Sequence, residues 1–80
     1  MKLPRDLSAD AVSKHLARYG YTVTRQTGSH LRLTTKQGEE HHVTIPSPGP
    51  LRVGTLNAIL TDVASHLKKS KQELIQELFG

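Results

Sequence analysis

Residues 30–46, HLRLTTKQGEEHHVTIP, contain two runs in which polar and apolar residues alternate, and Gln37-Gly38 separates them. Such alternation is typical of a strand with one buried face, because successive side chains of a strand point to opposite faces. A glycine-containing turn between two such runs predicts an antiparallel hairpin, with strands over residues 30–35 and 41–46. The side chains of its buried face are expected to be Leu31, Leu33, Val43 and Ile45.

The two apolar faces also fix the register of this hairpin. Leu33 should lie opposite Val43, because a slip of one residue would turn every side chain of the strand to the other face. The same register predicts three further pairs, which are Leu31 with Ile45, Thr34 with His42, and His30 with Pro46.

The segment upstream of the hairpin predicts a helix followed by a first strand. Ser8 is a natural N-cap, and Leu7 and Val12 are spaced to pack across it as a hydrophobic staple. Gly20 should end this helix, because glycine readily adopts the left-handed conformation of many helix C-termini. The first strand is then expected over residues 21–26.

The segment downstream predicts two more helices. The proline-rich residues 46–50 should end the sheet, because proline donates no backbone hydrogen bond. A second helix is expected to open at Gly54-Thr55, with Thr55 as its candidate cap. Residues 70–73, SKQE, form a capping box of the type S-x-x-E and should begin the last helix. The apolar stripe of the second helix would be Leu56, Ile59, Leu60, Val63 and Leu67.

This α-β-β-β-α-α order predicts one small α+β domain over residues 1–80, with a three-stranded antiparallel sheet and helices on one face. The other face of such a sheet should be solvated, because the helices can cover only one. The side chains expected on this open face are Thr22, Thr24, His30, Arg32, Thr34, His42 and Thr44.

The composition favours a macromolecular partner over a small molecule. The 80 residues are 35% apolar and 4% aromatic and include no tryptophan, so they offer little material for a deep pocket. Lys and Arg number 11 against 7 Asp and Glu, for a net charge of +4. An excess of positive charge favours polyanions such as nucleic acid, although the same charge can serve solubility alone.

Nothing in the sequence predicts export or membrane insertion. The chain starts MKLPRDLSAD, without an apolar leader, and no apolar run approaches the roughly 18 residues of a membrane span. It has no cysteine, which excludes disulfides and thiolate chemistry. We therefore expect a cytoplasmic protein without a membrane segment.

No cofactor or metal is expected. The sequence lacks a Gly-rich phosphate loop, a G-x-S-x-G elbow, an H-E-x-x-H helix and an EF-hand loop. His30 and His42 share the open face, but about four strand residues separate them, roughly 13 Å at ~3.3 Å per residue. Zinc ligands lie about 2 Å from their ion, so these two histidines cannot share one.

Histidine and positive charge remain as the candidate chemistry. Metal-free RNA cleavage needs a base for the 2′-hydroxyl, an acid for the leaving 5′-oxygen and cations for the phosphate, and imidazole suits both proton roles. His30 is the best placed histidine, because Gly28 leaves room for a phosphate and Ser29 can donate a hydrogen bond to it. Arg32 emerges on the same face and can bind a phosphate bidentately. From the residues alone, a solvated histidine at a strand edge is the competing interpretation.

Further candidates for phosphate contacts are Lys14, Arg18 and Arg52. Lys14 and Arg18 are four residues apart and share one ridge of the first helix. The remaining histidines are interpreted as structural, with His15 and His66 on helix surfaces and His41 packed at the end of the hairpin.

Three motifs occur in a specific order along the chain, namely GSH at 28–30, VTIP at 43–46 and GTLNAIL at 54–60. In this combination the sequence resembles the HicA-type mRNA interferase toxins over nearly its whole length. The resemblance implies a fold like that of double-stranded RNA-binding domains, cleavage of mRNA, and a HicB-type antitoxin as partner. It also implies that His30, the histidine of the GSH motif, is catalytic.

The loop after the third strand departs from the family pattern. Many members carry a second histidine shortly after the strand-ending proline, whereas SPGP at 47–50 has none. Three interpretations therefore remain open: a toxin that cleaves RNA with His30, a non-catalytic RNA-binding module, and a protein whose open sheet face docks a partner.

Overall fold

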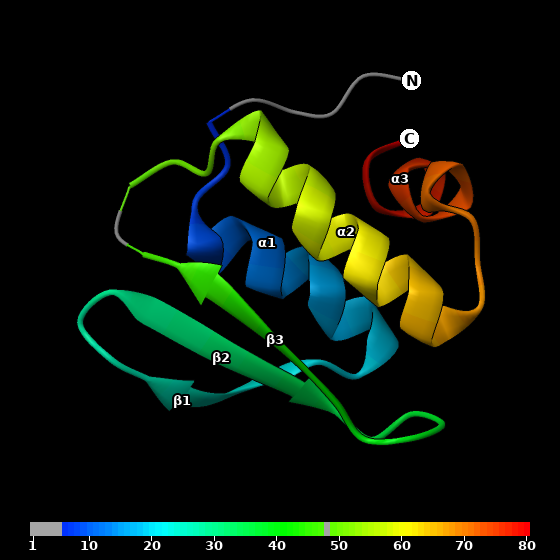
Figure 1. The fold of residues 1–80 in the computed structure, drawn as a ribbon, viewed down its shortest axis with the longest axis horizontal. Coiled ribbons are helices and arrows are strands. Elements are labelled where there is room, and N and C mark those ends of the chain that lie inside the picture. The colour runs from blue at the N-terminus through cyan, green and yellow to red at the C-terminus, as the bar shows by residue number, and fades with distance from the viewer. Residues whose placement is uncertain (1–5, 48) are drawn as a thin grey trace.

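The structure, a computed structural model, describes residues 6–47 and 49–80 (Figure 1). The elements follow the order α1 (Ala9–Leu16), a short 3-10 helix η1 (Ala17–Tyr19), β1 (Thr22–Gln26), β2 (His30–Thr35), β3 (His41–Pro46), α2 (Val53–Leu67) and α3 (Lys71–Phe79). The strands form one antiparallel sheet in the order β1-β2-β3. The predicted α+β arrangement, similar to double-stranded RNA-binding domains, is therefore confirmed.

The register of the β2-β3 hairpin is the one that the alternation predicts. Leu33 lies opposite Val43, and the outer pairs include His30 with Pro46. The apolar face of the hairpin is buried, because α1 and α2 cover it from one side (Figure 1). The largest side chains of the core are Tyr21, Leu16, Leu33, Ile45, Leu56, Leu60, Leu74, Val12 and Val63. Burial of each such side chain stabilises the fold by about 1.5–3 kcal/mol.

The helix ends follow the predicted signals with one exception. The Ser8 side chain accepts a hydrogen bond from the Ala11 amide, and Gly20 after η1 has φ of 83°. The capping box of α3 is formed, with Ser70 and Glu73 bonded to each other's backbone amides. The prediction that Thr55 caps α2 is wrong.

The second helix begins earlier than its sequence suggests. It starts at Val53, and the extended Arg52 is its N-cap residue, without a side-chain hydrogen bond to the first turn. Thr55 therefore lies inside the first turn of the helix and cannot cap it. Within residues 6–47 and 49–80, every helix is too short or too polar to cross a membrane.

The open face of the sheet is less uniformly solvated than predicted. Thr34 was expected to be exposed, but only 8% of it is accessible. Its hydroxyl lies 2.9 Å from that of Thr24 and 2.7 Å from Nδ1 of His42, so polar neighbours on both adjacent strands cover it. The prediction is wrong for Thr34 because it considered only burial by the helices. It did not consider burial by side chains of the adjacent strands.

Candidate nucleic-acid interface and active site

The GSH motif lies in a tightly bonded turn between β1 and β2. The Thr27 amide donates to the carbonyl of His30 at 2.9 Å, and the His30 amide donates to the Thr27 hydroxyl at 3.2 Å. The Ser47 amide, from the loop after β3, donates to the carbonyl of Ser29 at 2.8 Å. The backbone of the motif is thus fixed from two sides, while the side chain of His30 is exposed to solvent.

A hydrogen bond orients the imidazole of His30. The Ser29 hydroxyl oxygen lies 2.9 Å from Nδ1 of the ring. When Nδ1 carries a hydrogen it donates to this hydroxyl, which leaves the lone pair of Nε2 available to take a proton. The same hydrogen bond persists in the protonated ring, which can then give the proton from Nε2. The arrangement is compatible with either a general base or a general acid.

The other histidine of the open face has a different environment. Nδ1 of His42 lies 2.7 Å from the Thr34 hydroxyl, and Nε2 lies 3.1 Å from a carboxylate oxygen of Glu40. Both ring nitrogens therefore have protein partners. His42 is less available than His30 for proton exchange with a substrate.

Arg32 follows His30 on the same face of β2, and sequence reasoning missed its neighbour on β1. An irregularity in β1 between Val23 and Arg25 shifts the register, so that Arg25 lies opposite Arg32. Both arginines are exposed. The alternation of β1 carries no signal of this shift, because Arg25 is flanked by polar residues on both sides.

The remaining predicted contact residues are scattered. Lys14 is exposed on α1, and Arg52 is exposed immediately before α2. Arg18 follows α1 and donates from its guanidinium to the backbone carbonyl of Glu77 in α3. In Figure 1 the end of α1 and the start of β2 lie at opposite ends of the molecule, so Arg18 is not brought to His30.

Gly28 lies in open space. A Cβ built at this position would meet no atom within 4 Å, so the fold itself does not require a glycine there. Room for an approaching phosphate is consistent with this position. The structure therefore brings together Gly28, Ser29, His30, Arg32 and the unpredicted Arg25.

A second group of titratable side chains lies at the far end of the sheet. Nδ1 of His41 is 2.7 Å from the Tyr21 hydroxyl, and its Nε2 is 3.3 Å from a carboxylate oxygen of Asp62. The ring of His66 stacks on that of His41, with ring centroids 4.4 Å apart. Burial, and to a lesser degree the charge of Asp62, raises the pKa of Tyr21 to about 12. His41 packs at the hairpin end as predicted.

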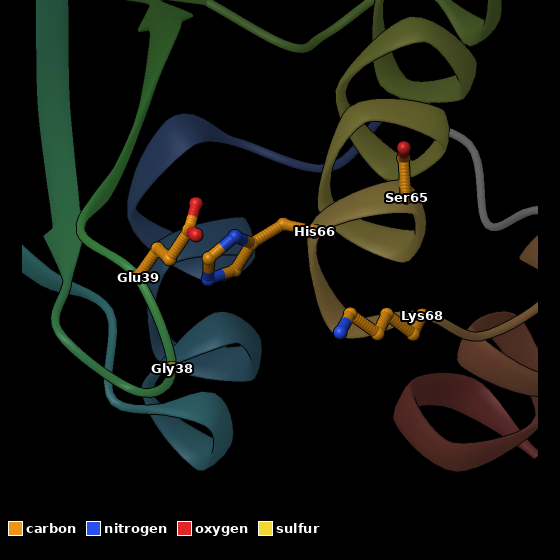
Figure 2. A pocket seen from close by; sticks show the side chains of 5 residues that line it. All are labelled: Gly38, Glu39, Ser65, His66 and Lys68. Carbon is orange, nitrogen blue, oxygen red and sulfur yellow. The ribbon is translucent and has the colours of Figure 1, made fainter.

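The position of His66 corrects a prediction. His66 was expected on the helix surface, but its Nε2 lies 3.0 Å from the carbonyl of Gln37 and links α2 to the β2-β3 turn. Figure 2 shows its ring beside Glu39 in a pocket lined by Gly38, Glu39, Ser65, His66 and Lys68. Among the described residues, no three His, Asp or Glu side chains are grouped as a metal site requires.

These features define a small basic α+β domain that presents a hydrogen-bonded, solvent-exposed histidine beside two arginines on an open sheet face. The chain belongs to the HicA toxins: the family described as HicA toxin of bacterial toxin-antitoxin matches residues 9–64. This range runs from the start of α1 into α2 and includes the GSH motif and both arginines. No curated protein and no solved structure matches the chain.

Proposed function

We propose that this toxin is a metal-independent endoribonuclease that cleaves mRNA, with His30 as its general acid or base. The observation that carries the proposal is the Ser29–His30 hydrogen bond at the start of β2. It fixes the ring through Nδ1 in a side chain that is exposed to solvent, and Nε2 is not used by this hydrogen bond. Family membership supports a toxic activity, and the net positive charge of the chain, together with the exposed Arg25 and Arg32, supports RNA as its target.

The reaction that suits these groups is transfer of the phosphate to the neighbouring 2′-oxygen. The 2′-oxygen forms a bond to phosphorus as it loses its proton to a base, and the bond from phosphorus to the 5′-oxygen breaks as that oxygen gains a proton from an acid. The products carry a 2′,3′-cyclic phosphate and a 5′-hydroxyl. Nε2 of His30 serves one of these two proton transfers.

Positive charge beside His30 would lower the barrier further. Negative charge develops on the phosphate oxygens in the transition state, and a guanidinium can donate two hydrogen bonds to them. Arg32 is two residues from His30 on the same face of β2 and is exposed. We assign this electrostatic role to Arg32.

A HicB-type antitoxin is the proposed partner, and the open sheet face is its proposed binding surface. An RNA-cleaving toxin requires an inhibitor in its own cell, and covering His30 and Arg32 would block the substrate directly. A partly acidic antitoxin would associate rapidly with this face. In the complex, His30 should be protected from diethylpyrocarbonate, and RNA should compete with the antitoxin. Simultaneous binding of both would contradict this assignment.

The proposed activity is tested by incubating the purified protein with RNA in EDTA. We expect cleavage to persist and the products to carry 2′,3′-cyclic phosphate and 5′-hydroxyl ends. Loss of cleavage on chelation, restored by added metal, would contradict the mechanism. Binding of RNA without cleavage under any condition would favour the alternative, a non-catalytic RNA-binding module.

A further inference from the structure

The irregularity in β1 has the geometry of a β-bulge. Thr24 and Arg25 together lie opposite a single residue of β2, Arg32. Val23 before them and Gln26 after them each have a regular cross-strand partner on β2. The Thr24 hydroxyl lies 2.9 Å from that of Thr34, a side chain of the open face, so Thr24 also lies on the open side. Without the bulge, Thr24 would stand opposite Arg32, and Arg25 would point to the helix-covered side of the sheet. The bulge therefore adds a second arginine to the face that carries His30.

The two arginines form a like-charged cross-strand pair, and such a pair is expected to cost the fold some stability. Directly opposed residues on neighbouring strands have Cα atoms about 4.5–5.5 Å apart, and like charges at such positions are destabilising. Neither Arg25 nor Arg32 has an acidic partner or a side-chain hydrogen bond among residues 6–47 and 49–80. A fold that only needed solubility could place these charges apart. An anion between the two guanidinium groups would remove the repulsion.

We propose that Arg25 and Arg32 together bind one phosphate of a single-stranded RNA, the phosphate that reacts at His30. The inference rests on the proposed RNA-binding function and adds Arg25 to it as a substrate-positioning residue. Two guanidinium forks on adjacent strands can converge on one phosphate and fix the direction of the RNA across the sheet. Arg32 alone could bind a phosphate but could not fix that direction.

The test measures RNA affinity and thermal stability in the His30→Ala background, which prevents cleavage during the measurement. Arg25→Gln removes one charge from the pair, and Lys36→Gln removes one from the exposed residue that follows β2 at the far end of the sheet. The probe is a labelled single-stranded RNA oligonucleotide, titrated at several salt concentrations.

We expect Arg25→Gln to weaken binding about tenfold, as for the loss of one charge-assisted contact. The log-log salt dependence should become shallower by about 0.7. Lys36→Gln should change affinity by less than about twofold, and Arg25→Lys should retain the salt dependence while losing part of the affinity. Arg25→Gln should also raise the Tm by roughly 1–4 °C at low salt, because the repulsion is gone.

Equal affinities for the Arg25→Gln and Lys36→Gln variants would overturn the inference, as would a fall in Tm that accounts for the weaker binding. Cleavage is measured separately with His30 restored. If the protein binds RNA through Arg25 but does not cleave it, the inference stands and the proposed catalysis fails. If the protein cleaves RNA and Arg25→Gln changes neither affinity nor rate, the proposed catalysis stands and the inference about Arg25 fails. Absence of any RNA binding would overturn both.

Discussion

His30 and His41 begin neighbouring strands at opposite ends of the same sheet, and their surroundings differ in kind. His41 has a partner on each ring nitrogen and stacks on His66. Among residues 6–47 and 49–80, the His30 ring has one hydrogen-bond partner, the adjacent Ser29, and the side chain is exposed to solvent. A histidine with two protein partners links elements of the fold, whereas one that is held through a single nitrogen can exchange a proton with a substrate. The local environment, and not the residue type, separates the two roles.

The largest stability effect should come from the far end of the sheet. His41→Ala removes the partner of the Tyr21 hydroxyl, which lies on a side chain only 1% exposed. An unsatisfied buried hydroxyl and the lost ring packing should together lower the free energy of unfolding by about 2–3 kcal/mol. His30→Ala should change it by less than about 0.5 kcal/mol, because the side chain is exposed to solvent. Chemical denaturation of both variants measures this difference, and an equal loss of unfolding free energy in the two variants would contradict it.

The next effect concerns the hydrogen bond that holds the His30 ring. Ser29→Ala should reduce the cleavage rate about tenfold and leave stability unchanged, because it frees the ring without removing it. Ser29→Thr keeps a hydroxyl and should recover most of the rate. The pH dependence of the rate should also shift in Ser29→Ala, since the hydroxyl no longer bonds either charge state. An unchanged rate and pH profile would show that Ser29 does not position His30.

Alkaline pH should reduce the stability that the buried side chains of Tyr19 and Tyr21 contribute. Burial raises the pKa of both Tyr19 and Tyr21 to about 12, with smaller contributions from Glu77 and Asp62 respectively. A raised pKa in the folded state favours the neutral phenol, so this contribution is complete below pH 10 and is lost as the pH rises from 10 toward 12. The loss should be on the order of 1 kcal/mol. Tyrosinate absorbance that appeared near pH 10 in the folded protein would contradict this account.

The smallest effect is a gain in stability beside His66. Lys68 ends α2 in the left-handed conformation, with φ of 59°, which is strained for a residue with a side chain. Lys68→Gly should raise the free energy of unfolding by about 0.5–1 kcal/mol. It should not change RNA cleavage, because Lys68 lies at the end of the molecule away from His30. A destabilised variant would show that the lysine side chain contributes more than its backbone strain costs.

The sequence predicts the hairpin well because alternation and register are local properties. Leu33 and Val43 could be paired, and His30 placed at a strand start, without knowledge of the rest of the fold. The bulge that brings Arg25 to Arg32 was not predictable, because Thr24, Arg25 and Gln26 are all polar and give no face preference. A bulge leaves a sequence signal only where it interrupts an apolar pattern.

Tertiary contacts account for the other differences. The stacking of His66 on His41 joins α2 to β3, which lie far apart in the sequence, so no local pattern could reveal it. The start of α2 was missed because Arg52 offers no side-chain cap. The GSH motif was recognisable as a candidate site, but its hydrogen bond between Ser29 and His30 depends on a backbone conformation that only the folded turn provides.

The most direct test of the central claim compares single-turnover cleavage of RNA by His30→Ala and His42→Ala. Both positions lie on the open face, but His42 has protein partners on both ring nitrogens. We expect His30→Ala to lose at least about 10²-fold in rate and His42→Ala to remain within a few-fold of the parent, with similar denaturation midpoints. Full activity of His30→Ala, or equal losses in both variants, would contradict the assignment of His30 as the catalytic residue.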